Sequence, residues 1–187
     1  NLLETATISH ISNEHYGRPG DAVKGDRSVD YMFGWESART GFGESALFHL
    51  DRAATVHEVI VDTYLHRLNA PLSCHLFATY ARENEIEARM KLCPRWMIEF
   101  DDGIRVIPDD FQHYMASASY LSEPVEKPGQ FTVRLHSGED SPWHPLISFG
   151  RLLPDTWHSF KEIEHQEAVT HILYMHYPNG EIGRAHV

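Results

Sequence analysis

The sequence predicts an all-β fold, an antiparallel β-sandwich of the jelly-roll type with short helices in its connections. Eight short segments are rich in Val, Ile, Thr and aromatic residues and are separated by turn-forming residues, whereas helical periodicity is weak. Many short strands with long connections are typical of sandwiches and jelly rolls. The 187 residues, 42% of them hydrophobic and 23% charged, suffice for a single domain spanning residues 1–187.

The predicted strands differ in the faces they would bury. Residues 131–135 alternate, with Phe131, Val133 and Leu135 on one face, whereas residues 169–177 are apolar on both faces, as in a central strand. The Asn179-Gly180 dipeptide predicts a hairpin between the last two strands, because type I′ turns need positive φ at both positions. The hairpin would place Arg184 opposite Tyr174 or Met175 and favours a structural role for His171. The eight strands are expected at residues 45–50, 56–65, 73–80, 96–100, 104–107, 131–135, 169–177 and 182–187.

Helices are expected only in the connections. Residues 81–92 contain good helix formers with a thin apolar stripe, and residues 109–120 could form a few turns. Five prolines between residues 124 and 154 predict a long loop-rich stretch.

Composition excludes several classes of partner. The formal charge of −11, without a basic cluster, argues against nucleic acid, and the absence of an apolar run of about 18 residues argues against a membrane span. Cys74 and Cys93 lie beside apolar residues, which favours buried thiols in a reducing compartment; a disulfide is the alternative. We expect a cytoplasmic protein. Because the chain starts at Asn1 without Met or a signal-peptide pattern, we also expect its extreme N-terminus to be missing.

Fourteen histidines are the clearest deviation in composition. They are scattered, and neither an HExxH motif nor a pair at metal-ligand spacing occurs. The sequence therefore requires no cofactor, and a divalent metal is left as an open alternative. A single histidine in a pocket could still act as an acid or base near neutral pH.

The stretch DYMFGWESARTGFG, residues 30 to 43, is the first candidate site segment. One interpretation is a packing loop anchored by Trp35, with Glu36 and Arg39 paired on the surface. The other is the mouth of a site: its glycines allow close approach to a ligand, Trp35 and Phe33 wall the pocket, and the planar Arg39 fork binds a carboxylate. We favour the second.

The second candidate segment is the end of the strand that contains Val59 to Val61. Val59, Val61 and Thr63 would face the core, with Asp62 on the other face. A carboxylate there needs a hydrogen-bond partner. Asp62 could serve a nearby backbone turn, or act with His66 in holding an amide-type substrate or polarising a water.

Several segments, in order along the chain, resemble the repeat of the allantoicase family. They are NLL at the start, GWESART, VIVDTYLHRLNAPLSCHLFA, LLPDTWHSF and VTHILYMHYPNGEIGRAHV, and the resemblance omits roughly residues 81–130. The GxAVxGD pattern of residues 20–26 and the following Trp also resemble discoidin-like, galactose-binding-like jelly rolls. The resemblance implies a jelly roll that hydrolyses allantoate to ureidoglycolate and urea. Allantoicases carry two such repeats in tandem, so a single repeat implies a homodimer or higher homo-oligomer.

Three motifs depart from the family pattern. The family's GHDW corresponds to GFGES at residues 41–45, its HFxGN to HRLN at residues 66–69, and its PDGG to PNGE at residues 178–181. The first change removes a His and an Asp, which weakens the expectation of the family activity more than that of the fold.

The candidate residues follow from these segments. A carboxylate and an imidazole can activate water and protonate the leaving nitrogen in C–N hydrolysis. The candidate catalytic residues are Glu36, Asp62 and His66, and the candidate substrate-binding residues are Trp35, Arg39, Thr63, Asn69 and Arg184.

Three functions are consistent with these residues. The first is allantoicase-like hydrolysis of allantoate or a related small polar, acidic ureido compound. The second is a diverged lyase, isomerase or cyclase of a specialised pathway. The third is a non-catalytic ligand- or carbohydrate-binding module, since fold alone does not determine function.

Overall fold

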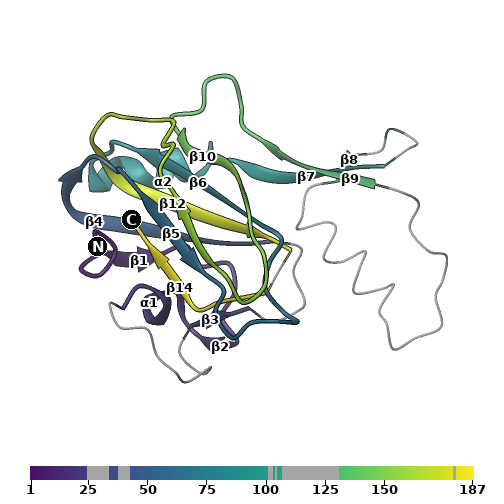
Figure 1. Cartoon of the computed structure of the whole chain (residues 1–187). Helices are drawn as coiled ribbons and strands as arrows, with labels where there is room; N and C mark the ends of the chain where they lie inside the picture. The colour runs from purple at the N-terminus through teal and green to yellow at the C-terminus, as the bar shows by residue number, and fades with distance from the viewer. Residues whose placement is uncertain (25–33, 38–42, 101–102, 104, 107–130, 179) are drawn as a thin grey trace.

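The computed structural model describes residues 1–24, 34–37, 43–100, 103, 105–106, 131–178 and 180–187, and within them the strands form four antiparallel sheets (Figure 1). The largest sheet has the order β1-β4-β12-β6-β10. A smaller sheet, β11-β5-β14, lies against it and completes the sandwich (Figure 1). The chain is thus an all-β jelly-roll sandwich with short helices in its connections, as predicted.

The bounds of the elements follow the chain. The large sheet contains β1 (Thr7–Ser9), β4 (Glu44–Ala54), β12 (Val169–Tyr177), β6 (Ser73–Thr79) and β10 (His144–Arg151), and the facing sheet contains β11 (Trp157–Phe160), β5 (Val59–Asp62) and β14 (Arg184–His186). The third sheet contains β13 (Glu181–Ile182), β3 (Trp35–Glu36) and β2 (Tyr16–Gly17), and the fourth contains β8 (Arg105–Val106), β7 (Arg95–Phe100) and β9 (Phe131–His136). The helices are α1 (Pro19–Ala22), η1 (Glu83–Glu85) and α2 (Ile86–Met90).

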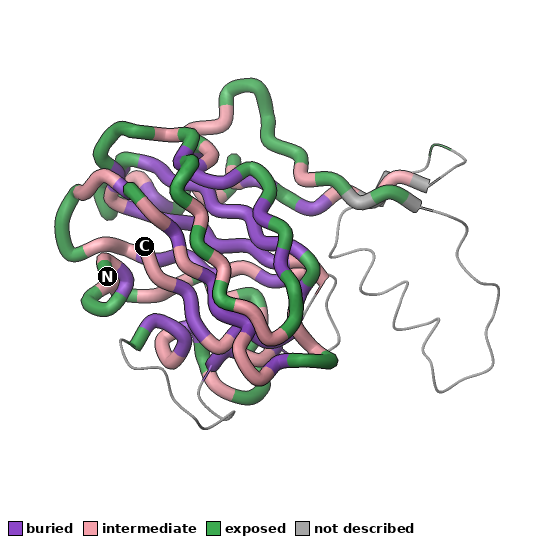
Figure 2. The backbone as a smooth tube through the Cα atoms, viewed as in Figure 1, coloured by how far each residue is buried: buried purple, intermediate pink, exposed green. Residues whose placement is uncertain are grey.

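The central strand β12 is buried on both faces, as its sequence predicted. Ile172 and Tyr174 contribute to the core between the two sheets, and Leu173 and Met175 contribute to a second cluster on the opposite face. Figure 2 shows buried residues concentrated on these inner strands. The second cluster also contains Trp96 of β7 and therefore fixes the base of the β7–β9 arm that projects from the sandwich (Figure 1).

The hairpin predicted at Asn179-Gly180 does not form, and that prediction was wrong. β12 already pairs with β4 on one side and β6 on the other, so neither edge remains for the residues that follow it. After the cis Tyr177-Pro178 bond the chain leaves the sheet, pairs through β13 with β3, and then pairs through β14 with β5. Arg184 consequently lies opposite Asp62 rather than Tyr174 or Met175.

Two other predictions need correction. The expected loop over residues 124–154 contains β10, which tolerates Pro145 because it is an edge strand whose register is irregular on either side of Ile147. The helix expected over residues 81–92 is shorter: it begins as the 3₁₀ turn η1, and α2 ends at Met90. The helix expected over residues 109–120 lies outside the described residues.

Both cysteines are free thiols, Cys74 buried and Cys93 partly buried, so the disulfide alternative is not realised. No helix in the described part of the chain has the length and apolar character that a bilayer crossing requires.

Candidate functional site

Three segments distant in sequence meet at one end of the sandwich (Figure 1). Ser37, after β3, donates its backbone N–H to the carbonyl of Gly180 at 3.1 Å. Glu181 of β13 donates to the carbonyl of Asn69 at 2.8 Å, and Gly183 donates to that of Asp62 at 2.8 Å. Backbone bonds to both neighbouring segments therefore hold residues 180–183 between β3 and the chain that follows β5.

At this junction His66 and Glu181 form a buried pair. Nδ1 of His66 lies 3.0 Å from Oε2 of Glu181, and their side chains are 4% and 11% exposed. The amide of Asn69 donates to the same carboxylate oxygen at 2.5 Å. A carboxylate only accepts hydrogen bonds, so the Nδ1–H of His66 donates to Glu181, and in the tautomer with this proton Nε2 is the nitrogen that can accept one. This is the orientation that a carboxylate imposes on a catalytic histidine.

Gly183 packs beside the other ring nitrogen. A Cβ added at residue 183 would lie 3.5 Å from Nε2 of His66 and 3.2 Å from the carbonyl oxygen of Asp62. A side chain at this position would therefore press against the carbonyl of Asp62 and contact the imidazole, and glycine avoids both contacts.

Glu36 of β3 lies directly opposite Glu181 of β13. The register of β3 and β13 sets these two residues opposite each other, and Tyr16 of β2 is the partner of Glu36 on the other side. Directly opposed residues of antiparallel strands share a face, with Cβ atoms about 5 Å apart. Two carboxylates thus lie on one face of this small sheet, and one of them is bonded to His66.

Asp62 and Arg184 are opposite each other on β5 and β14, and both are buried. Oδ1 of Asp62 accepts the backbone N–H of Tyr64 at 3.0 Å, which fixes the turn toward His66. On the other side of Asp62 the register places Trp157, which is 45% exposed. The face of this sheet that is turned away from Val61 and Ala185 therefore carries a buried carboxyl and a buried guanidinium beside an exposed indole.

The remaining predicted residues occupy different settings. The hydroxyl of Thr63 donates to the carbonyl of Leu153 and accepts the backbone N–H of Thr156, and so holds that loop against β5. Trp35 is 1% exposed and donates its indole N–H to the carbonyl of Asn13 at 2.9 Å, which is the packing anchor of the first interpretation of residues 30–43. Arg39 and Phe33 lie outside the described residues. Contact of any of these residues with a substrate stays a prediction.

The structure also reveals polar residues that sequence reasoning missed. Glu181 was seen only as a departure from the family's turn, because the false hairpin hid its contacts with His66 and Asn69. Glu44 and His176 are 2% and 0% exposed and lie opposite each other on β4 and β12. Their position at the ends of two apolar strands was the signal that could have identified them, since an unexplained charge in a core strand is informative.

Burial determines the protonation of this second pair. Desolvation raises the pKa of Glu44 to about 7, although the hydrogen bond from Ser12 opposes the rise. Desolvation lowers the pKa of His176 to about 3. Glu44 therefore titrates near neutrality while the adjacent imidazole stays uncharged.

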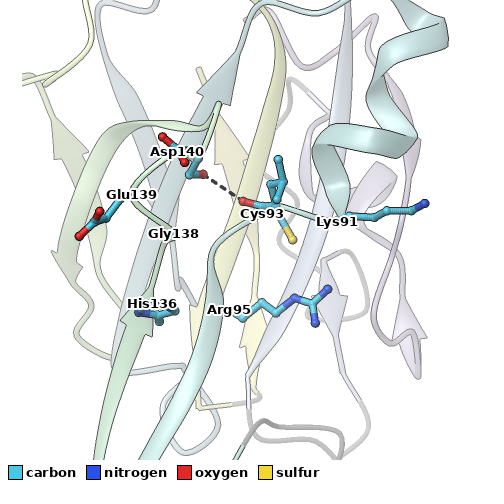
Figure 3. A pocket seen from close by; sticks show the side chains of 9 residues that line it. Lys91, Cys93, Arg95, His136, Gly138, Glu139 and Asp140 are labelled. Carbon is cyan, nitrogen blue, oxygen red and sulfur yellow. Dashed lines mark hydrogen bonds between the residues drawn. The ribbon is translucent and has the colours of Figure 1, made fainter.

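A separate hollow of about 420 Å³ lies at the base of the β7–β9 arm (Figure 3). Figure 3 places Glu139 across the hollow from Lys91, and the hydroxyl of Ser141 donates to the carbonyl of Leu92 at 3.0 Å. None of the candidate residues described above lines this hollow. Among the described residues, no group of three or more His, Cys, Asp or Glu side chains is placed to hold a metal ion.

The fold and site define a β-sandwich domain with a carboxylate–imidazole cluster at one end. The family model described as "Allantoicase repeat" matches residues 2–187. The chain therefore belongs to the allantoicase-repeat family, as its motifs suggested.

Individual relatives agree with this family. The chain is 30% identical over 83 residues to a probable allantoicase of Pseudomonas fluorescens, a match that covers 42% of this chain and 25% of the relative. Two solved structures, one described as allantoicase and one as the allantoicase of Saccharomyces cerevisiae, each match with a TM-score of 0.59 and 17% identity. Each match covers 96% of this chain but 39% of the solved chain, so this chain spans about two fifths of their length.

Proposed function

We propose that this chain is an allantoicase-like hydrolase that cleaves a C–N bond of allantoate, or of a related small ureido acid, and releases urea. The buried His66–Glu181 pair, held by Asn69 beside Glu36, carries this proposal. Family membership supports the substrate class, and the pair supplies the acid–base chemistry that the reaction needs.

In the proposed reaction, Nε2 of His66 takes a proton from water as the water oxygen bonds to the carbon that bears the ureido group. The C–N bond breaks, and the imidazolium returns the proton to the departing nitrogen, which leaves as urea. Glu181 stabilises the imidazolium and keeps the ring in place. Glu36 orients the water or the leaving ureido group from the opposite strand.

The proposed substrate contacts use the rest of the end face. Arg184 beside Asp62, together with Arg39, would bind the substrate carboxylate, and Asn69 and Thr63 would position the segment after β5. The buried side chain of Trp35 would support this end of the sandwich from the core side. The resemblance to a family with two tandem repeats supports a homodimer, in which a second copy takes the place of the second repeat.

Urea release from allantoate is the direct test. We expect the wild type to release urea and His66→Gln to lower kcat about 10²–10⁴-fold, the usual contribution of a general acid–base residue. His57→Gln, which removes an exposed histidine, is the matched control and should leave kcat unchanged. The melting temperature of each variant separates lost chemistry from lost folding.

Other outcomes favour the alternatives. Tight binding of a ureido acid without urea release would support a binding module. Conversion of such an acid without urea release would support a diverged lyase, isomerase or cyclase. If His66→Gln folds normally and keeps full activity, the assignment of the base is wrong.

A further inference from the structure

A second polar cluster lies on the interior side of the same end, behind Trp35. Glu44 of β4 and Tyr174 and His176 of β12 are 2%, 1% and 0% exposed. The ring of Trp35 lies 5.0 Å from that of His176 and 6.1 Å from that of Tyr174, measured between centroids. Glu36, the next residue on β3, points to the opposite face, so the two clusters flank one strand.

Four polar atoms of this cluster have no hydrogen-bond partner within the part of the chain that the structure describes. They are Oε1 of Glu44, the hydroxyl of Tyr174, and Nδ1 and Nε2 of His176. Buried polar groups in native proteins are almost always hydrogen-bonded, and each orphan costs about 1–3 kcal/mol. Several buried polar atoms without hydrogen-bond partners at one end of a sandwich indicate side chains that bind a ligand rather than stabilise the fold.

A short surface strap, residues 11–15, is hydrogen-bonded to Glu44 of the cluster and to Trp35, which packs against it. Ser12 donates its hydroxyl to Oε2 of Glu44 at 2.5 Å and accepts the backbone N–H of Ser45 at 2.8 Å. Asn13 accepts the indole N–H of Trp35, and His15 donates its backbone N–H to the carbonyl of Glu36. Ser12 is itself exposed, so the buried carboxyl of Glu44 is bonded directly to a residue that reaches solvent.

The chemistry of the cluster selects the ligand. Burial raises the pKa of the Glu44 carboxyl to about 7 and keeps the adjacent His176 imidazole uncharged, so the cluster offers an anionic ligand no positive charge of its own. The available groups are a carboxyl, a neutral imidazole and a phenol, which together offer both donors and acceptors. Their complement is a small, uncharged planar group with N–H donors and a carbonyl acceptor.

We propose that Glu44, Tyr174 and His176 form a binding site for the ureido group of the substrate, reached when the strap over residues 11–15 lifts. The choice of a ureido group over another amide rests on the proposed function. The carbonyl accepts from Tyr174, and the ureido N–H groups donate to Oε1 of Glu44 and to the unprotonated nitrogen of His176. The planar group stacks beside Trp35.

The test compares two tyrosines of the same strand. Tyr174→Phe removes the hydroxyl and keeps the packed ring, and Tyr177→Phe makes the same change on the opposite face of β12. We expect Tyr174→Phe to weaken allantoate binding by about two- to tenfold, the value of one hydrogen bond. Binding is measured by calorimetry with every protein carrying His66→Gln, so that allantoate is not consumed, and Tyr177→Phe should bind as the protein with an unchanged strand does. Equal affinity for all three proteins overturns the proposal.

A second measurement is independent of turnover. N-methylurea is titrated in the millimolar range into full-length protein with labelled tyrosines, and the Tyr174 ring signal is identified by its loss in Tyr174→Phe. A saturable shift of this signal, enhanced in Ser12→Ala, supports the site. No shift, or a shift with guanidinium but not with N-methylurea, overturns it.

The two proposals fail separately. If the wild type neither binds nor hydrolyses allantoate, the proposed function fails, and the N-methylurea titration alone decides whether the cluster binds ureido groups. If allantoate is hydrolysed while Tyr174→Phe and the wild type have the same affinity and the Tyr174 signal stays fixed, the function stands and the site is wrong.

Discussion

Glu44→Gln should stabilise the protein above neutral pH. The carboxyl of Glu44 is buried and bonded to Ser12 on one oxygen, and burial raises its pKa from 4.5 to about 7. The folded protein therefore retains a proton that the unfolded chain releases above pH 4.5. The stability associated with this proton is fully present below pH 4.5 and is lost as the pH rises through about 7. Glutamine has nearly the same shape and does not titrate.

The magnitude follows from the pKa. A rise from 4.5 to about 7 corresponds to roughly 3–4 kcal/mol at about 1.4 kcal/mol per pH unit. We expect the free energy of unfolding of Glu44→Gln, relative to wild type, to increase by roughly 2–3 kcal/mol between pH 5 and pH 8.5. Histidines and other carboxylates titrate in both proteins, so their contributions cancel in the difference.

Reversible denaturant unfolding at four or five pH values measures this difference. Glu164→Gln is the control, because Glu164 also accepts hydrogen bonds from a serine, Ser148, but at the surface. Its effect should stay within about 0.5 kcal/mol at every pH, as for most surface substitutions. A Glu44→Gln difference that is flat with pH would show that this carboxyl is ionised in the folded protein at neutral pH, and the reasoning about burial would be refuted.

Three further predictions concern the backbone, acid stability and assembly. Gly17→Ala should lower the free energy of unfolding, measured with denaturant, by at least about 2 kcal/mol, because Gly17 has φ +65° and a Cβ would lie 1.9 Å from the carbonyl oxygen of Gly34. Gly138→Ala is the control and should leave it nearly unchanged, because the space around Gly138 is open. Burial lowers the pKa of His171 to about 4 and that of His176 to about 3, so the stability that these neutral imidazoles contribute should be full above pH 6.5 and fall as the pH drops toward 4, by about 1.4 kcal/mol per pH unit for His176 and by less for the less deeply buried His171. The fall is measured in Glu44→Gln, where the opposing titration of that carboxyl is absent, and an unchanged denaturation midpoint at pH 5 in that variant would contradict this. Sedimentation equilibrium should give twice the chain mass, and a monomer at working concentration would count against the dimer.

The fold class and the long strands could be predicted from the sequence because periodicity and composition are local properties. Strands β4, β6 and β12 are long enough for their apolar pattern to be read, and the two-sided pattern of residues 169–177 correctly placed that strand at the centre of the sheet. The two-residue strands β2, β3 and β13 carry no readable period, and pairing between distant segments defines them. Local patterns cannot supply such pairings.

The candidate site was predicted in part for the same reason. His66 and Asn69 were identified through one short motif, and the structure brings both to Glu181. Glu181 itself was missed because the Asn179-Gly180 pair favoured a local hairpin, whereas both edges of β12 were already occupied. Competition for strand edges is a property of the whole sheet, and it decided where the last eight residues went.

The two ends of the chain meet on the sandwich, where the backbone N–H of Leu2 donates to the carbonyl of Val187 at 2.7 Å. A domain whose two ends lie side by side can be duplicated in tandem, or inserted within another protein, through a short connector and without disruption of its sheets. Duplication of such a unit would preserve the core of each copy and leave the surface between the copies free to evolve.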